Sequence, residues 1–279
     1  MWRKTKMRAL LNFTEVIGDV PIGDLTREHA LKYHKWWAAR LKPKRGRKAK
    51  SPNTANRDIG NLRKLYREFF KYLGEEDREN PFRGLTFKES FAPETPSFSD
   101  DWVRTKILVP GVLSGIKARY LAYALIETGC RPSELANLMP EDICLDAEVP
   151  HIKIRPRQDR EIKTHSSIRD IPLVGVSLEA MKRAPKGFPH YRDKNDLLSQ
   201  SLVKAFRNRG LMETERHVIY SFRHSFEKRM LEAGLDYGLR CLLMGHRTSR
   251  PAYGDGGSLA YRRDELMKIV HPYPADLFD

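Results

Sequence analysis

Two predicted helices meet in the segment Thr128-Gly129-Cys130-Arg131-Pro132-Ser133-Glu134-Leu135. The first is expected from Ile116 to Glu127 and to stop at Gly129, because glycine accepts the left-handed backbone conformation that commonly ends a helix. The second is expected to begin at Pro132, because proline fits the first turn, where a backbone amide hydrogen is not needed. Arg131 is therefore predicted to stand directly before a helix N-terminus.

Downstream of this segment, the pattern changes to a mixture of strands and helices. Residues 151–154 and 168–173 carry β-branched side chains with polar turn material between them, which predicts a small sheet or hairpin. Helices are expected from Tyr220 to Leu231, from Asp236 to Met244 and, as a short amphipathic segment, from Leu259 to Val270. The second part of the chain is therefore expected to combine helices with a small β-sheet.

Upstream of the segment, the first part of the chain is expected to be helical. Thr26 can cap one helix, and Pro52 opens another, which Gly74 and Asn80-Pro81 end. In both helices apolar residues recur every three or four positions, which predicts a buried face. These residues are Ala30, Tyr33, Trp37 and Leu41 in the first helix, and Ala55, Ile59, Leu62, Tyr66, Phe69 and Leu73 in the second.

Length and composition divide the chain. Its 279 residues are enough for two domains of common size. The stretch from Ser90 to Asp101 contains two prolines and has the composition of a linker. We therefore expect a helical domain at residues 1–92, a linker at 93–104 and a mixed domain at 105–279. The expected fold class is mainly α with a small β-sheet (α+β).

The net charge of +15 is concentrated in the first part of the chain. Up to residue 92 there are 22 Lys or Arg residues against 11 Asp or Glu, whereas the remainder has 29 against 25. A domain of this charge is expected to contact a polyanion. Nucleic acid is the first candidate, although ribosomal and membrane-surface proteins are also basic.

Other classes of protein are disfavoured. No apolar run approaches the roughly 20 residues that span a bilayer, and the N-terminus lacks the apolar stretch of a signal peptide. The three cysteines are scattered without a CxxC pair, so neither a disulfide framework nor a zinc site is indicated. We therefore expect a cytoplasmic protein that has no membrane partner and binds no metal.

Two groups of basic residues in the first part are candidates for contact with phosphates. The stretch from Arg40 to Lys50 has seven basic residues and no acidic one, and its proline and glycine predict a loop. Another group recurs at four-residue steps along the helix that begins at Pro52. The candidate DNA contacts are Arg45, Arg47 and Lys48 in the loop, and Arg63, Arg67 and Lys71 on the helix. A solvated loop and a solvated helix face are the plain alternatives.

Arg131, Arg223, His246 and Tyr253 form the set with the clearest chemical meaning. Attack on a phosphodiester builds negative charge on its non-bridging oxygens. Two guanidiniums can neutralise that charge without a metal, because each is planar and always charged. Tyr220 lies three residues before Arg223 on a predicted helix, so both can face one point. A phenol, with a pKa near ~10, is a weak nucleophile at neutral pH and needs a nearby cation and a base. Each residue alone is usually structural, so only the combination carries weight.

The order of three motifs resembles the tyrosine recombinases, the phage-integrase family of DNA strand-exchange enzymes. The motifs are residues 128–135, Phe222-Arg223-His224-Ser225-Phe226 and Leu243-Met244-Gly245-His246. The resemblance covers nearly the whole chain. Residues from about 10 to 90 are similar to the family's helical core-binding domain, and Thr105 to Val270 are similar to its catalytic domain. It implies a C-shaped clamp with one domain on each face of the DNA.

The resemblance implies a role for each catalytic candidate. Arg131 and Arg223 would hold the scissile phosphate. Lys163 looks like the family's β-hairpin lysine and would protonate the 5′-oxygen leaving group, because an alkoxide leaves poorly. His246 would hydrogen-bond the phosphate or accept the proton of the tyrosine. Tyr253, which follows His246 by seven residues, would be the nucleophile.

Other residues take lesser roles or depart from the family pattern. Glu134, one turn along from Arg131, would hold that segment in place, and His224 would support the site. Tyr220 stands where the family commonly has histidine. A phenol can donate a hydrogen bond to a phosphate oxygen but is a poor base near pH 7. Tyr220 is therefore a candidate catalytic residue, and the duty of general base would move to His246 or to water.

The nucleophile has two rivals, of which Tyr237 precedes His246 and is therefore in the wrong order, so Tyr261 is the chief one. Tyr261 follows His246 by fifteen residues, which is too long for the family. Tyr253 follows it by seven, an interval slightly shorter than usual.

The resemblance implies a site-specific recombinase or integrase that cleaves and rejoins DNA through a covalent 3′-phosphotyrosine intermediate. It would need no metal, other cofactor or ATP, and would serve the integration or excision of a phage or mobile element. The implied partners are double-stranded DNA, a homo-tetramer on synapsed sites and accessory DNA-bending proteins, at the nucleoid of a bacterial or phage-infected cell. Two alternatives stay open: a DNA-relaxing enzyme similar to type IB topoisomerases, and a DNA-binding regulator without catalysis. The C-terminal helix could pack on a neighbouring protomer or on its own core.

Overall fold

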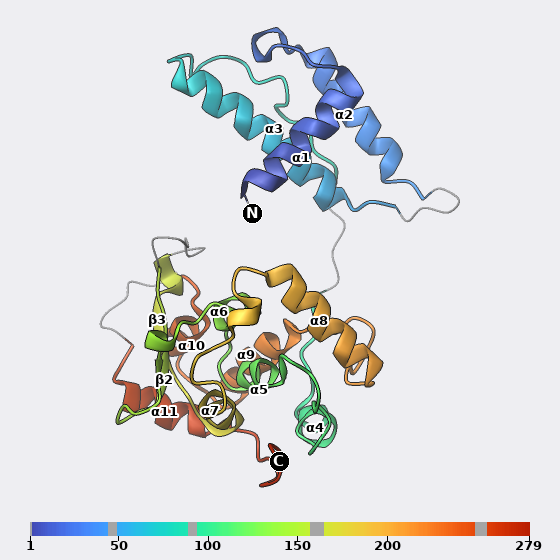
Figure 1. The fold of residues 1–279 in the computed structure, drawn as a ribbon. Coiled ribbons are helices and arrows are strands. Elements are labelled where there is room, and N and C mark those ends of the chain that lie inside the picture. Colours follow the sequence, from blue (N-terminus) through green and yellow to red (C-terminus); the bar gives the residue numbers. More distant parts are fainter. Residues whose placement is uncertain (1, 44–48, 89–93, 157–164, 249–255) are drawn as a thin grey trace. The chain divides into compact units, whose positions relative to one another are not determined.

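The computed structural model describes residues 2–43, 49–88, 94–156, 165–248 and 256–279. The chain divides into two compact units, Met1–Pro93 and Glu94–Asp279 (Figure 1). Each unit has its own core of buried apolar side chains. Both units are built mainly of helices, and the second also contains a small β-sheet, which confirms the predicted fold class. None of the helices in these ranges has the length and the apolar character that a membrane crossing requires.

Two of the three α-helices that the structure describes in the first unit, α2 (Arg27–Arg40) and α3 (Pro52–Tyr72), begin where the sequence predicts. The other is α1 (Trp2–Ile17). Thr26 caps α2, because its hydroxyl accepts a hydrogen bond from the backbone amide of His29. Ser51 caps α3 by accepting a hydrogen bond from the amide of Thr54, and Pro52 occupies the first turn.

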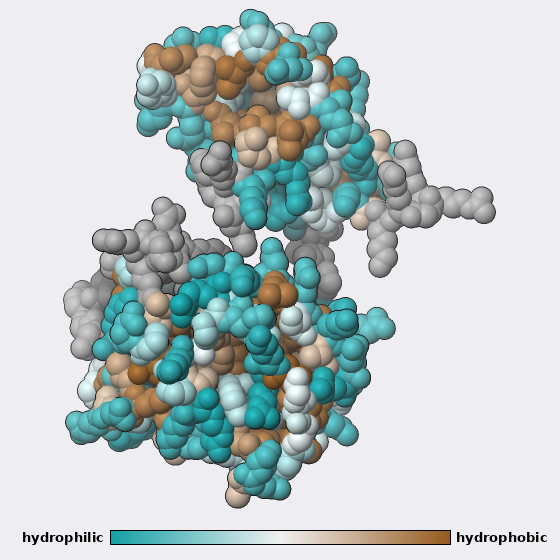
Figure 2. Space-filling model, in the orientation of Figure 1, coloured by the Kyte–Doolittle hydropathy of each residue, from teal (hydrophilic) through white to brown (hydrophobic). Residues whose placement is uncertain are grey.

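The buried face of α3 differs from the predicted one at its C-terminal end. The side chain of Phe70 is only 4% exposed, whereas Phe69 and Leu73, which were expected inside, are 41% and 51% exposed. Two steps of four residues lead from Leu62 through Tyr66 to Phe70, so the buried face continues at Phe70 and not at Phe69. Figure 2 shows that hydrophobic patches interrupt the hydrophilic surface of this unit.

The second unit surrounds a three-stranded antiparallel sheet with helices. Its helices are α4 (Asp100–Trp102), α5 (Arg119–Ile126), α6 (Pro132–Ala136), α7 (Gly175–Lys182), α8 (Asn195–Asn208), α9 (Ser221–Glu232), α10 (Tyr237–Met244) and α11 (Leu259–Met267). Its strands are β1 (Ile143–Cys144), β2 (His151–Ile154) and β3 (Arg169–Pro172). β2 and β3 form the predicted pair, with Ile152 opposite Ile171. The sequence did not predict β1, α7 or α8.

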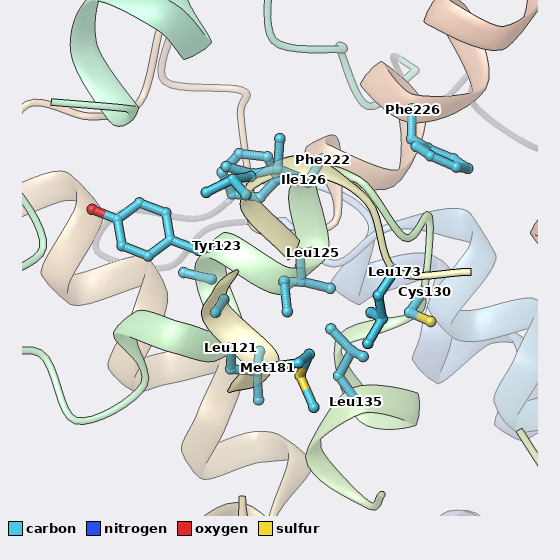
Figure 3. Packing of buried hydrophobic residues seen from close by; sticks show 14 of the residues in the cluster. Leu121, Tyr123, Leu125, Ile126, Cys130, Leu135, Leu173, Met181, Phe222 and Phe226 are labelled. Carbon is cyan, nitrogen blue, oxygen red and sulfur yellow. The ribbon is translucent and has the colours of Figure 1, made fainter. Parts of the chain in front are cut away.

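α5 forms the centre of the second core. Every residue from Leu121 to Ile126 is buried, and the helix packs against α6, α7 and α9. Figure 3 shows the side chains of α5 among Leu135, Met181 and Phe222, which come from these three helices. Because α5 leads directly into residues 128–135, this packing fixes the joint that carries Arg131.

Gly129 at this joint cannot be replaced without strain. Its φ of +59° lies in the left-handed region, as predicted for a residue that ends a helix. A Cβ at this position would lie 2.3 Å from Cδ1 of Phe226 and 3.1 Å from Sδ of Met244. Helices α9 and α10 therefore close directly onto the joint between α5 and α6.

The segment from Glu94 to Arg104, which was expected to lie in the linker, belongs to the second unit. Phe98 and Val103 are buried in its core. Ser99 also donates hydrogen bonds from its amide and its hydroxyl to the carboxylate of Glu213, at 2.8 and 2.7 Å. These apolar and polar anchors outweigh the linker-like composition on which the prediction rested.

The C-terminal segment folds onto its own unit, which is one of the two alternatives that the sequence leaves open. Leu266 and Leu277 are buried in the second core. The ring of Phe278 lies 5.1 Å from that of Tyr123 in an edge-to-face arrangement. In the single chain this segment is therefore part of the core around α5.

Candidate active site

The carboxylate of Glu134 is the centre of a cluster of arginines. Glu134 lies in α6, and its Oε2 accepts a 2.8 Å hydrogen bond from the backbone amide of Arg131. Nη1 of Arg131 donates to Oε1 at 2.6 Å. The same Nη1 is 3.4 Å from Oγ of Ser167, which lies two residues before the first residue of β3. The first turn of α6 thus holds the Arg131 side chain in a fixed direction.

Arg169, at the start of β3, is a member of the cluster that sequence reasoning missed. Its Nη2 donates to Oε2 of Glu134 at 2.8 Å, and its Nη1 is 3.3 Å from Oε1. Its side chain is completely buried. The residue lies inside the predicted strand, but only its long-range contacts reveal its role in the cluster.

Glu134 stays ionised because of these arginines. Burial raises the pKa of its carboxyl group, but the charge and hydrogen bonds of Arg169, the backbone amide of Arg131 and the charge of Arg131 outweigh it and hold the pKa at about 2. Nη1 of Arg223 is also within 4.0 Å of Oε2. Three guanidiniums therefore face one carboxylate, and the cluster keeps an excess of positive charge.

Arg223, on α9, joins this cluster to the end of α10. Its side chain is only 2% exposed. Nη1 donates to the carbonyl oxygen of Gly129 at 2.6 Å, and Nη2 donates to the carbonyl oxygen of Met244. Nη2 is also 3.0 Å from Nε2 of His246. Burial lowers the pKa of Arg223, but an arginine remains charged at neutral pH.

His246 stands at the open edge of the cluster. Gly245, with a φ of +61°, ends α10 and turns the chain so that the exposed His246 faces Arg223. Burial, together with the charges of Arg223, Arg131 and Arg169, lowers the pKa of the imidazole. The neutral ring can accept the hydrogen bond of Arg223 at Nε2, with its own hydrogen on Nδ1. The arrangement offers two arginines and a neutral histidine to an anion.

Comparisons with known proteins connect this geometry to a family. No model of a known protein family matches the chain. Its sequence is 26% identical to the tyrosine recombinase XerC of Staphylococcus carnosus (strain TM300), over 69% of this chain and 67% of that protein. The chain belongs to the tyrosine recombinase family.

Solved structures of recombinases have the same fold. One is the Tn1549 transposon integrase in complex with transposon right end DNA, with a TM-score of 0.57 and 20% identity over 88% of this chain and 85% of that one. Another is a lambda integrase dimer bound to a COC′ core site, with a TM-score of 0.59 and 14% identity over 88% and 84% of the two chains. At these identities the likeness concerns the fold.

Two further candidates of this recombinase, Tyr220 and His224, lie at the start of α9 (Ser221–Glu232). Tyr220 precedes α9, and its carbonyl oxygen accepts a hydrogen bond from the amide of Arg223 at 3.0 Å. Its side chain is exposed, and its ring lies 5.4 Å from that of His224. Burial and the charge of Arg223 lower the pKa of His224. His224 directly follows Arg223 on the chain, and Tyr220 precedes Arg223 by three residues.

The structure brings together four of the predicted site residues of the recombinase: Arg131, Glu134, Arg223 and His246. Lys163 and Tyr253 lie outside the described residues, so their roles rest on the sequence. Among the residues that are described, no group of three or more His, Cys, Asp or Glu side chains is placed to hold a metal ion.

The predicted DNA contacts of the first unit have different surroundings. Arg63 donates from Nε to the carbonyl oxygen of Phe82 at 3.0 Å and from Nη2 to that of Leu85 at 2.9 Å, so it fastens the segment after α3 instead of facing solvent. Arg67 and Lys71 are exposed and form ion pairs with acidic neighbours. Arg45, Arg47 and Lys48 lie outside the described residues.

A basic groove of the first unit was not predicted. It has a volume of about 270 Å³ and lies among α1, α2 and α3. Arg8, Arg40, Lys50 and Arg57 line it, and the guanidinium of Arg40 lies 3.4 Å from the centre of the Trp36 ring. These cations come from three helices and one loop, so no single periodic pattern in the sequence reveals them.

Proposed function

We propose that this recombinase cleaves and rejoins DNA at a specific site through a covalent 3′-phosphotyrosine intermediate, and that it integrates or excises a phage or another mobile element. The observation that supports this most is the meeting of Arg131 and Arg223 at Glu134, with His246 in contact with Arg223. These residues are distant in sequence and come from α6, α9 and the end of α10.

The cluster suits a phosphodiester. In the transition state of phosphoryl transfer, negative charge is spread over the non-bridging oxygens, and fixed donors stabilise it. Arg131 offers the more accessible guanidinium, since its side chain is 19% exposed. Arg223 is more deeply buried. It can exchange one of its hydrogen bonds within the chain for one to a phosphate oxygen. The neutral His246 can accept a proton or donate a hydrogen bond, depending on the orientation of its ring.

The bond changes follow from these roles. The phenolic oxygen of Tyr253 attacks the phosphorus while the bond to the 5′-oxygen breaks. The phenolic proton passes to His246 or to water, and Lys163 supplies a proton to the leaving 5′-oxygen, which departs as a hydroxyl. Tyr220 donates a hydrogen bond to a phosphate oxygen. The phosphotyrosine keeps the energy of the phosphodiester, so a 5′-hydroxyl reverses the step without ATP or a metal.

DNA is the partner that the charge favours. The groove of the first unit gathers Arg8, Arg40, Lys50 and Arg57, which can neutralise successive phosphates. The Tn1549 and lambda integrases, which share the fold, were both solved with DNA. Four protomers would hold two sites, with accessory DNA-bending proteins, at the nucleoid.

A nicked suicide substrate tests the proposal. Cleavage releases a short DNA piece, so the covalent adduct accumulates, and peptide mapping should place it on Tyr253. Tyr253→Phe should bind the same DNA without forming the adduct, and the reaction should proceed in EDTA. Adduct formation at Tyr261, or full activity of Tyr253→Phe, would contradict the assignment of the nucleophile. Binding without any adduct would favour a regulator.

A further inference from the structure

We propose that Arg169 is a positioning residue of the active site. It fixes the positions of the phosphate-binding arginines, Arg131 and Arg223, and of the segment that carries His246 relative to β3. The inference rests on the proposed function. It concerns a residue that makes no contact with solvent and reaches the reaction only through the groups it touches.

The guanidinium of Arg169 joins three elements. Its Nε donates to the carbonyl oxygen of Leu243 in α10 at 2.8 Å. Its Nη1 donates to the carbonyl oxygen of Ser167, before β3, at 2.8 Å, and its Nη2 binds Glu134 of α6 at 2.8 Å. The planar fork of arginine can serve all three directions at once, whereas a lysine ammonium donates from a single point.

The segment that carries His246 rests directly on this guanidinium. A Cβ on Gly245 would lie 2.8 Å from Nη1 and 3.1 Å from Cζ of Arg169. The backbone one residue before His246 therefore packs closely against the guanidinium, and the carbonyl oxygen of Leu243 accepts a hydrogen bond from it. Any change in the size or position of Arg169 displaces the end of α10, and with it the ring that faces Arg223.

The same guanidinium also orients Arg131, through Glu134. Oε2 of Glu134 receives hydrogen bonds from Arg169 and from the backbone amide of Arg131, while Oε1 receives one from the Arg131 side chain. Without Arg169 the carboxylate is free to rotate toward Arg131 or Arg223. Arg169 therefore acts on both sides of the phosphate site, on Arg131 through Glu134 and on His246 through α10.

The chain offers a matched control for a merely structural role. Arg229, on α9, also forms a buried ion pair, with Glu127 at 2.8 Å, and donates to the carbonyl oxygens of Ile126 and Ile269. It makes none of the contacts that join the catalytic cluster. Arg169→Lys and Arg229→Lys therefore each keep the positive charge and lose the planar guanidinium. Only Arg169→Lys removes contacts that position Arg131 and His246.

The first readout is single-turnover cleavage of the nicked substrate by folded protein at saturating DNA. A small misplacement of catalytic groups can lower a rate about 100-fold, and we expect a loss of this order for Arg169→Lys with DNA affinity nearly unchanged. Arg229→Lys should lower the melting temperature and leave the rate of the folded protein unchanged. Equal rates for the two variants would overturn the proposal.

The second readout does not depend on activity. NMR of the imidazole groups in the full chain should show the His246 signals, identified by their loss in His246→Gln, displaced in Arg169→Lys and unmoved in Arg229→Lys. Unmoved signals in both would overturn the proposal. If wild-type protein forms no adduct while the His246 signals still move, the proposed function fails and the positioning role stands. If Arg169→Lys and Arg169→Gln both fail to fold while Arg229→Lys folds, Arg169 is structural and the proposal is wrong.

Discussion

Arg223 of α9 donates a 3.0 Å hydrogen bond to Nε2 of His246, which follows α10. This hydrogen bond makes the protonation state of His246 depend on Arg223. A neutral imidazole has a lone pair to accept it, whereas an imidazolium carries hydrogen on both nitrogens. Because Arg223 is held by the carbonyl oxygens of Gly129 and Met244, it cannot turn away when the histidine is protonated without losing those bonds.

The pH dependence of cleavage should follow from this pair. Burial lowers the pKa of His246 below the ordinary 6.5, and Arg223, Arg131 and Arg169 lower it further, while Glu134 acts in the opposite sense. The group is therefore neutral above its lowered pKa. Single-turnover cleavage should stay constant as the pH falls through 6.5 and decline only below it. The acidic decline should be absent from the residual activity of His246→Gln. A decline centred above pH 6.5 would contradict this assignment.

Replacement of Glu134 by glutamine should destabilise the second unit. Removal of one partner of a buried ion pair leaves the others uncompensated and costs about 3–5 kcal/mol. The folded pKa of Glu134 is about 2, lower than in the unfolded chain. Its contribution is therefore complete above the unfolded pKa, near ~4.3, and is lost as the pH falls through about 2.

Urea unfolding from pH 7 to pH 2 measures this effect. The difference between wild type and Glu134→Gln should shrink steadily below the unfolded pKa. Glu179→Gln is the control, because Glu179 pairs with Lys182 and Arg183 on the surface, and exposed pairs contribute less than about 1 kcal/mol. A pH-independent difference for Glu134→Gln would mean that its charge is not what stabilises the fold.

The basic groove and the row on α3 predict different results for DNA binding. Arg57 is exposed and lines the groove, so Arg57→Ala should weaken binding and reduce the slope of log K against log salt by about 0.9. Arg63 is bound to carbonyl oxygens, so Arg63→Ala should lower stability and leave that slope unchanged. Fluorescence anisotropy over a range of KCl concentrations measures both. If Arg63→Ala reduced the slope and Arg57→Ala did not, the DNA contact would lie along the row on α3 and not in the groove.

Gly129→Ala should lower the free energy of unfolding by more than backbone strain alone. The added methyl would overlap Phe226, and overpacking of a core typically costs about 1–3 kcal/mol. Gly210 is the matched control, since its φ is also positive at +65° but a Cβ there meets nothing within 4 Å. Chemical denaturation should therefore show a larger loss for Gly129→Ala than for Gly210→Ala. Similar losses would mean that Phe226 relaxes freely.

Local signals in the sequence were sufficient for much of the fold. Thr26, Pro52 and Gly129 mark ends of helices through their own side chains or backbone freedom, so α2, α3 and the joint after α5 could be predicted. β1 has only two residues, and α8 has no side-chain cap. Such elements are fixed mainly by packing against distant residues, which a local pattern does not contain.

The candidate site divides in the same way. The spacing of the motifs indicated that Arg131, Arg223 and His246 belong together, and the structure brings them within reach of one another. Arg169 could not be assigned, because its partners Glu134 and Leu243 are 35 and 74 residues away. The part that Arg63 plays in the fold could not be predicted for a related reason. Its four-residue spacing is that of an exposed row, but the segment after α3 folds back to offer it two carbonyl oxygens.

The contacts of the three arginines with Glu134 also determine at which stage their side chains become ordered. A long side chain loses rotational freedom when it is fixed, at a cost of up to about 2 kcal/mol. Here that loss occurs while the chain folds, because Glu134 directs Arg131, Arg169 and Arg223 through contacts within the chain itself. The approaching phosphate therefore meets dipoles and charges that are already oriented, and little reorganisation remains for the chemical step itself.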